Sequence, residues 1–167
     1  MSTTPPRLLQ VGRLLPWLEQ RLQADYDTVR LADAPDPAAF LAARGGEFAG
    51  LVTSAGGSGA DAALIDALPS LRVISSFGVG LDKIDLAAAA RRGIAVGYTP
   101  DVLNDCVADL AMALMLDIAR RTPEGDRYVR QGRWSVPGPA PFPLGRKVSG
   151  ARLGIVGLGR IGQTIAR

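Results

Sequence analysis

The stretch Arg152-Leu-Gly-Ile-Val-Gly157-Leu-Gly159-Arg-Ile-Gly162-Gln-Thr-Ile-Ala-Arg167 decides how the fold of this chain is interpreted. Leu153 to Val156 form a short apolar run with β-branched residues, which predicts a buried parallel strand. Three glycines follow in the spacing G-x-G-x-x-G, and the residues after them suit the start of a helix. The pattern therefore predicts a strand, a tight turn and a helix in direct succession.

Each of the three glycines has a physical reason to stand in a dinucleotide-binding turn. Gly157 lets the strand turn tightly, Gly159 lets a pyrophosphate approach the backbone, and Gly162 lets the helix pack close to the strand. The N-terminus of the helix adds unpaired N–H groups that attract phosphate. We therefore expect dinucleotide binding, with a glycine-rich turn that binds nothing as the alternative. A charged residue about 20 residues further on would confirm it, and the sequence ends before that position.

Upstream of this stretch, residues 7–96 alternate between short apolar runs and segments with helical periodicity. Strands are expected at 8–11, 26–31, 50–53, 71–75 and 94–96, with helices at 14–22, 36–41, 61–68 and 86–92. Asp85 is expected to cap the last of these helices, and Gly93 to end it. Such alternation predicts an α/β fold with an open parallel sheet covered on both faces. In such sheets ligands bind beyond the carboxyl ends of the strands.

Two of the expected strands are followed by glycine-rich loops. Thr53-Ser-Ala-Gly-Gly-Ser-Gly59 follows the third strand, and Ser75-Ser-Phe-Gly-Val-Gly80-Leu-Asp82 follows the fourth. Because parallel strands end at the same edge, we expect the two loops to lie together. Their exposed N–H groups could form an anion-binding concavity. The alternative, that both loops are merely tight turns, stays open.

The alternation stops after residue 98. A long helix is expected from near Leu103 to Arg120, because apolar residues recur at spacings of three and four, and a shorter one at 124–131. Residues 132–150 contain four prolines and predict a loop or an interdomain crossing. We therefore expect a first domain at 1–98, a helix and linker at 99–150, and the start of a second domain at 151–167.

The composition is that of an ordinary globular protein and excludes several classes. Of 167 residues, 47% are apolar and 21% charged, and the net charge is +3. The basic residues are scattered, which argues against nucleic-acid binding, and no apolar run is long enough for a membrane span. A single cysteine excludes an intrachain disulfide and gives no sign of a metal site. The N-terminus lacks the pattern of a signal peptide, so a cytoplasmic setting is expected.

The chain resembles the D-isomer-specific 2-hydroxyacid dehydrogenases, most closely the glyoxylate/hydroxypyruvate reductase branch. The matching stretches span residues 50–167 in the family's order and spacing. They are Gly78-Val-Gly-Leu-Asp-Lys-Ile-Asp85-Leu, Arg92-Gly-Ile-Ala-Val96 with Thr99-Pro-Asp-Val-Leu103, Val107-Ala-Asp-Leu110 leading to Arg120, and Gly150 to Gly162. The resemblance implies a flavodoxin-like substrate domain of five parallel strands, followed by linker helices and the first strand, turn and helix of an incomplete Rossmann domain.

The resemblance also implies roles for particular residues. The substrate acid would lie against the loop residues and backbone amides of Ser54, Ala55, Gly56, Val79 and Gly80. The cofactor, NADP or NAD with NADPH favoured, would contact Val79, Val107, Gly157, Gly159, Arg160, Ile161 and Gly162. The implied reaction is hydride transfer between the nicotinamide and C2 of a 2-oxo or 2-hydroxy acid. A homodimer is expected for the complete protein.

The chain departs from the family in lacking its catalytic groups. The family's arginine, glutamate and histidine all lie downstream of the glycine motif, and this sequence has no histidine at all. We therefore interpret the chain as the N-terminal part of such an enzyme, inactive by itself, with no catalytic or metal-binding residue of its own. Two alternatives are a non-catalytic protein that senses dinucleotides with the same fold, and an independent flavodoxin-like module with an accidental glycine motif.

Overall fold

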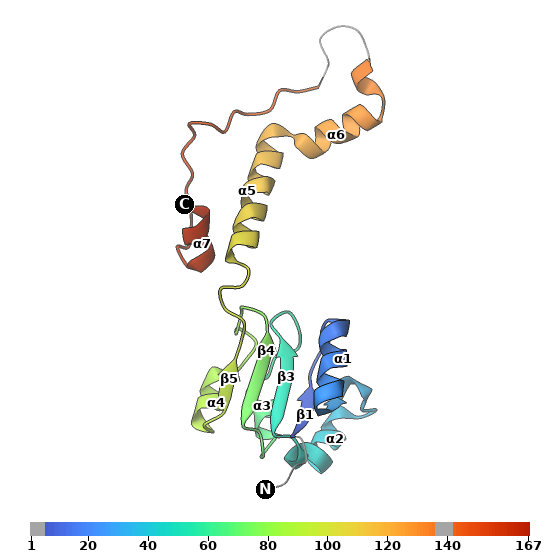
Figure 1. Cartoon of the computed structure of the whole chain (residues 1–167). Coiled ribbons are helices and arrows are strands. Elements are labelled where there is room, and N and C mark those ends of the chain that lie inside the picture. Colours follow the sequence, from blue (N-terminus) through green and yellow to red (C-terminus); the bar gives the residue numbers. More distant parts are fainter. Residues whose placement is uncertain (1–5, 136–141) are drawn as a thin grey trace. The chain divides into compact units, whose positions relative to one another are not determined.

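The structure is a computed structural model that describes residues 6–135 and 142–167 (Figure 1). It divides into two compact units, Met1–Val102 and Leu103–Arg167, and each is described by itself. Within the described residues, no helix is long and apolar enough to cross a membrane.

The first unit is built on a five-stranded sheet in which all neighbours are parallel. Its strands lie in the order β2-β1-β3-β4-β5. They are β1 (Arg7–Gln10), β2 (Asp27–Arg30), β3 (Gly50–Ser54), β4 (Val73–Phe77) and β5 (Ala95–Gly97). The α/β fold with a parallel five-stranded sheet is therefore confirmed, with each strand within two residues of its expected start.

Helices connect the strands, and aspartates begin three of them. The helices are α1 (Pro16–Asp25), α2 (Pro37–Arg44), α3 (Ala62–Asp66) and α4 (Leu86–Arg91), with short 3₁₀ turns η1 (Leu31–Asp33) and η2 (Gly45–Glu47). Asp36, Asp61 and Asp85 each accept hydrogen bonds from backbone N–H groups in the first turn of the helix that follows. Gly93, with φ +65°, ends α4 as expected.

The strand order decides which helices cover which face. The connection from β1 to β2 runs in one direction along the sheet, and all later connections run in the other. Because parallel crossovers are right-handed, α1 lies on one face and α2, α3 and α4 lie on the opposite one. The face under α3 and α4 holds the core, which includes Leu9, Leu51, Phe48, Ile65, Leu68, Ile74, Ala88 and Ala89.

The face under α1 is covered only in part, which differs from the expectation that both faces are covered. On β4, Ile74 is fully buried in the core. Val73 and Phe77 of the same strand face α1 and are 42% and 38% exposed. An apolar groove of about 540 Å³ runs beside them, lined by Leu8, Leu18, Leu22 and Val52 among others. A single helix on this face is too narrow to cover all five strands.

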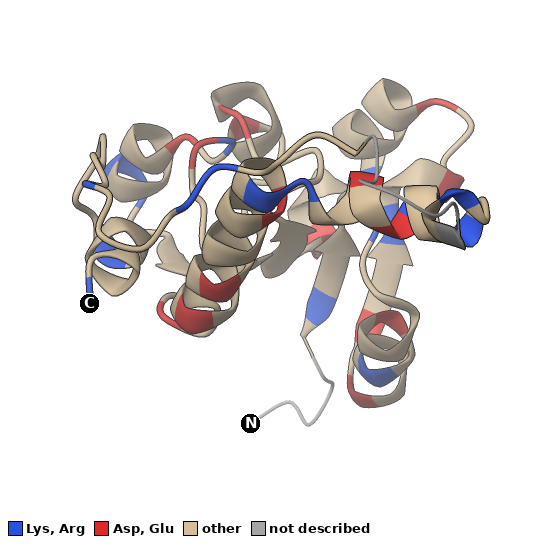
Figure 2. Cartoon of the chain, turned by 90° about the horizontal axis from the view of Figure 1, so that it is seen from above, with Lys and Arg blue, Asp and Glu red and all other residues tan. Residues whose placement is uncertain are grey.

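The second unit is helical. It contains α5 (Asn104–Arg120), α6 (Thr122–Arg130), η3 (Arg133–Ser135) and α7 (Arg160–Ile165), and α7 packs against α5. Arg121 adopts a left-handed conformation, with φ +59°, and separates α5 from α6. Figure 2 shows basic and acidic positions interspersed along the chain, and Asp126 and Glu124 pair with Arg130 and Arg121.

The strand expected at Leu153 to Val156 is absent, so that prediction is wrong. Among the described residues of the second unit no strand lies beside this segment, and an unpaired segment is not a strand. Leu153 is 52% exposed and Val156 is fully exposed, whereas Leu51 and Ile74 of the first unit are fully buried. This segment is therefore less well packed than the strands of the first unit.

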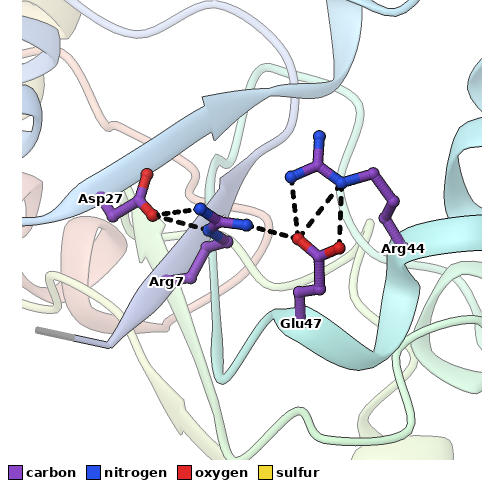
Figure 3. Close-up of polar contacts among 4 residues, drawn as sticks. All are labelled: Arg7, Asp27, Arg44 and Glu47. Atoms are coloured by element: carbon purple, nitrogen blue, oxygen red, sulfur yellow. Dashed lines mark hydrogen bonds and ion pairs between the residues drawn. The ribbon is translucent and has the colours of Figure 1, made fainter. Parts of the chain in front are cut away.

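Charged residues join the amino-terminal ends of the strands (Figure 3). Arg7 at the start of β1 pairs with Asp27 at the start of β2, with 2.6 Å between the nitrogen and oxygen atoms, and also with Glu47. Arg44 at the end of α2 donates to both oxygens of Glu47, the shortest of these bonds being 2.8 Å. The Arg44 guanidinium and, to a smaller degree, that of Arg7 lower the pKa of Glu47 to about 2.

A substitution at Gly45 tests the packing of the end of α2 against the end of α3. Gly45 is buried, and a Cβ placed on it would lie 1.9 Å from the carbonyl oxygen of Ala67. We expect Gly45→Ala to lower the free energy of unfolding by about 1–3 kcal/mol, because the backbone at this contact must shift. Gly46→Ala is the matched control, since its Cβ meets nothing nearer than 3.8 Å. Urea denaturation of both variants measures the difference, and equal stabilities would contradict this packing.

Glu47 gives the fold a predictable dependence on pH. The pKa of Glu47 falls from 4.5 to about 2 on folding. Its contribution to the stability of the folded state is therefore fully present above pH 4.5 and is lost as the pH falls towards 2. We expect Glu47→Gln to flatten the slope of thermal midpoint against pH within this window. Asp109→Asn, which removes an exposed carboxylate of α5 in the second unit, is the control for loss of one charge. Parallel slopes for wild type and Glu47→Gln would show that the ion pairs do not form in solution.

Candidate functional site

The carboxyl edge of the sheet brings together the two glycine-rich loops, as expected. The backbone N–H of Ala55, just after β3, donates to the carbonyl of Phe77 at the end of β4 over 3.1 Å. Gly78 has φ +143°, and a Cβ placed on it would lie 2.5 Å from the Cβ of Ala55. Only glycine fits so close to the neighbouring loop, which is the reason for this residue type at this position.

A third segment, after β5, is fastened to the same edge. The N–H of Gly78 donates to the hydroxyl of Thr99 over 3.1 Å, and the N–H of Thr99 donates to the carbonyl of Gly78 over 3.0 Å. The loops after β3, β4 and β5 are therefore joined by hydrogen bonds on both sides of Gly78. This reciprocal pair fixes the start of the 78–82 loop.

Backbone N–H groups at this edge are left unpaired. In the parts of the chain that the structure describes, those of Gly56, Val79 and Gly80 donate to no acceptor of the protein. Gly80 lies beside Ala55, since a Cβ on Gly80 would be 3.8 Å from that of Ala55. Unpaired N–H groups of successive loop residues form the kind of concavity that binds carboxylates and phosphates. The expected residues Ser54, Ala55, Gly56, Val79 and Gly80 thus lie at one edge.

The remaining expected site residues lie in the second unit. Gly157 has φ +92°, and a Cβ on Gly157 or Gly159 would meet no atom within 4 Å. A Cβ on Gly162 would lie 2.2 Å from the carbonyl oxygen of Gly157, so α7 packs tightly against the turn that precedes it. Arg160 and Ile161 form the first turn of α7, and Val107 lies in α5, the helix that α7 packs against.

This geometry meets two steric demands of a dinucleotide-binding turn, although the strand that the glycine spacing predicts before it is absent. The backbone around Gly159 is open to a pyrophosphate, and the packing at Gly162 needs a residue without a side chain. The described residues contain no group of three or more His, Cys, Asp or Glu side chains that could hold a metal ion. The turn at Gly157–Gly162 presents backbone N–H groups and an open backbone surface at Gly159.

Two residues of the carboxyl edge have roles that single-residue reasoning on the sequence did not assign. Thr99 accepts from Gly78, and Lys83 donates from its ammonium to the carbonyl of Gly57 over 2.8 Å. Both stand inside stretches that match the family, but neither pattern nor periodicity indicates a contact across loops. Their partners are 21 and 26 residues away in the sequence, which only the strand topology brings close.

The chain matches known proteins over nearly all of its length. Residues 13–164 match the family model described as D-isomer specific 2-hydroxyacid dehydrogenase, catalytic domain. The chain is 47% identical to hydroxyphenylpyruvate reductase of Plectranthus scutellarioides, over 90% of this chain and 47% of that protein. It therefore spans about half the length of the curated relatives it matches.

Two solved structures show the same fold. A 2-hydroxyacid dehydrogenase of Ketogulonicigenium vulgare gives a TM-score of 0.89 at 43% identity, covering 98% of this chain and 51% of that one. The NADPH-dependent glyoxylate/hydroxypyruvate reductase of Sinorhizobium meliloti, solved with NADP and malonate, gives 0.81 at 40% identity, covering 98% and 49%. Because the family model matches most of the length of this chain, the chain belongs to the D-isomer-specific 2-hydroxyacid dehydrogenase family.

Proposed function

We propose that the chain is the N-terminal part of an NAD(P)H-dependent reductase of the glyoxylate/hydroxypyruvate type. The complete enzyme would transfer hydride between the nicotinamide and C2 of a 2-oxo or 2-hydroxy acid. The observation that carries this proposal is the family match over residues 13–164, together with relatives about twice as long as this chain. Within it, 1–98 would bind the substrate, 99–150 would link, and 151–167 would begin the cofactor domain.

The carboxyl edge of the sheet would bind the carboxylate of the substrate. The N–H groups of Val79, Gly80 and Gly56 are unpaired within the described residues and close together in the fold. Ser54 and Ala55 would line the same pocket from the β3 side. A carboxylate that accepts several backbone hydrogen bonds is held in one orientation, which fixes C2 relative to the cofactor.

The glycine turn would hold the diphosphate of the cofactor. Gly157, Gly159 and Gly162 meet the steric demands of this role, with Arg160 and Ile161 in the helical turn that follows. Val107 would lie near the nicotinamide, and Val79 would be a further cofactor contact in the complete enzyme. When bound, the cofactor supplies the hydride, and the protein supplies orientation. We favour NADPH because the Sinorhizobium meliloti relative is described as NADPH-dependent and was solved with NADP.

The family resemblance places the proton chemistry of the reaction on residues downstream of the glycine motif. Histidine is the usual proton donor near neutral pH, and this chain has none. The complete protein would supply an arginine, a glutamate and a histidine, act as a homodimer and work in the cytoplasm. A dinucleotide-sensing protein of the same fold would share the binding edge and lack these three groups.

Activity assays separate the enzyme from the sensor. We expect the 167-residue chain to show no NADPH- or NADH-dependent reduction of hydroxypyruvate or glyoxylate, because the family's catalytic arginine, glutamate and histidine lie downstream of the glycine motif and are not among these residues. The product of the complete reading frame should reduce at least one of these acids. The reaction is monitored by the loss of absorbance of the reduced nicotinamide. Turnover by the 167-residue chain would overturn the proposal that it is incomplete. A complete product that binds NADPH and turns over neither acid would favour the sensor.

Gly162 tests the proposed cofactor turn. In the complete product, we expect Gly162→Ala to raise the Kd for NADPH roughly tenfold or more, because the Cβ forces α7 away from Gly157. Gly154→Ala is the control, since its Cβ meets nothing within 4 Å. Fluorescence of the bound nicotinamide measures both. Equal affinities for the two variants would remove residues 157–162 from the cofactor site.

A further inference from the structure

Lys83 fastens the loop that follows β3 from three directions. Its ammonium donates to the carbonyl of Gly57 over 2.8 Å and lies 3.5 Å from that of Gly56. Its own carbonyl accepts the N–H of Ala60 over 2.9 Å. Its Cβ and carbonyl pack so closely on Gly59 that a Cβ there would lie 2.5 Å and 2.1 Å from them. One residue of the 78–85 loop thus contacts most of the 56–60 loop.

The far end of this loop is anchored in the core. Ala60 is fully buried and forms a parallel bridge with Ile84, and its carbonyl accepts the N–H of Asp85. The near end is held by the bond from Ala55 to Phe77. Between these anchors, the hydrogen bonds of residues 56 and 57 to the neighbouring loop come from the Lys83 ammonium, within the part of the chain that the structure describes. The N–H of Gly57 closes a turn on Ser54 and does not reach across.

We propose that Lys83 is a positioning residue that holds the 54–59 loop against the 78–82 loop, so that the two sets of unpaired N–H groups form one carboxylate-binding site. The identity of the ligand rests on the proposed function. The contact by which Lys83 holds the two loops together does not depend on it. The ammonium also places a positive charge on the loop that carries the Gly56 N–H group, which favours an anionic ligand there. Lys83 touches neither substrate nor cofactor and acts through the loop.

Amide hydrogen exchange tests the fastening without any ligand. We compare wild type, Lys83→Met, which keeps the length of the side chain without its charge, and Lys83→Arg, which keeps the donor. Lys147→Met is the control, since Lys83 and Lys147 are the two lysines of the chain and Lys147 lies in the second unit. We expect exchange at the hydrogen-bonded amides of Ala55 and Gly57 to rise about fivefold in Lys83→Met, with Leu9 and Leu51 unchanged.

A reagent that acetylates amines gives a second measurement on the unsubstituted chain. The hydrogen-bonded ammonium of Lys83 should react more slowly than that of Lys147, by about fivefold. Equal rates would show that the bond from Lys83 to Gly57 does not persist in solution and would overturn the proposal.

Kinetics of the complete reading frame then test whether the fastening serves binding. Lys83→Met should raise KM for the 2-oxo acid about fivefold and leave kcat within about twofold, with Lys83→Arg close to wild type. Exchange at Ala55 and Gly57 that stays unchanged, or that rises equally in the core, would overturn the proposal, as would an unchanged KM. If the wild-type product has no reductase activity, the proposed function fails, while exchange and lysine reactivity still decide the fastening.

Discussion

The parallel direction of all five strands is the constraint on which this structure depends. Because every strand of the sheet points the same way, the segments after β3, β4 and β5 begin at one edge. The bonds from Ala55 to Phe77 and between Gly78 and Thr99 then join those segments. Loops with few side chains would otherwise have many conformations, and the joined edge restricts them to one.

The two edges of the sheet use different chemistry. At the amino edge, full charges on Arg7, Asp27, Arg44 and Glu47 are satisfied by one another (Figure 3). At the carboxyl edge, small residues leave backbone N–H groups unpaired, which is a state that a bound anion can satisfy. The four paired charges of the amino edge thus lie at the opposite edge from the unpaired N–H groups. They therefore neither attract nor repel at short range a ligand that binds at the carboxyl edge.

Most of the first unit could be predicted from the sequence, because local signals and the fold agree there. Apolar runs mark the strands, Asp85 and Gly93 mark the ends of α4, and the order of strands and helices determines the sheet. The expected strand at Leu153 failed for the opposite reason. Its pattern is that of a strand, but a strand needs a neighbour, and the part of the second unit that the structure describes contains none.

The contacts of the candidate site were harder to predict than its position. The glycine pattern places the loops at one edge, but it does not say that Lys83 reaches Gly57 or that Thr99 binds Gly78. Such contacts depend on register between strands, since Ser54 pairs with Phe77 and Ser75 with Gly97. The half-covered α1 face follows from handedness and strand order together, which no single segment reveals.

The central claim is that the unpaired N–H groups at the carboxyl edge bind the carboxylate of a small 2-oxo acid. The most direct measurement is a titration of the ¹⁵N-labelled chain with pyruvate, followed by the amide resonances. The claim predicts that the signals of Gly56, Val79 and Gly80 shift together and saturate, while those of Arg7 and Asp27 at the opposite edge stay in place. Shifts confined to the amino edge, or none at the three amides at saturating acid, would contradict it.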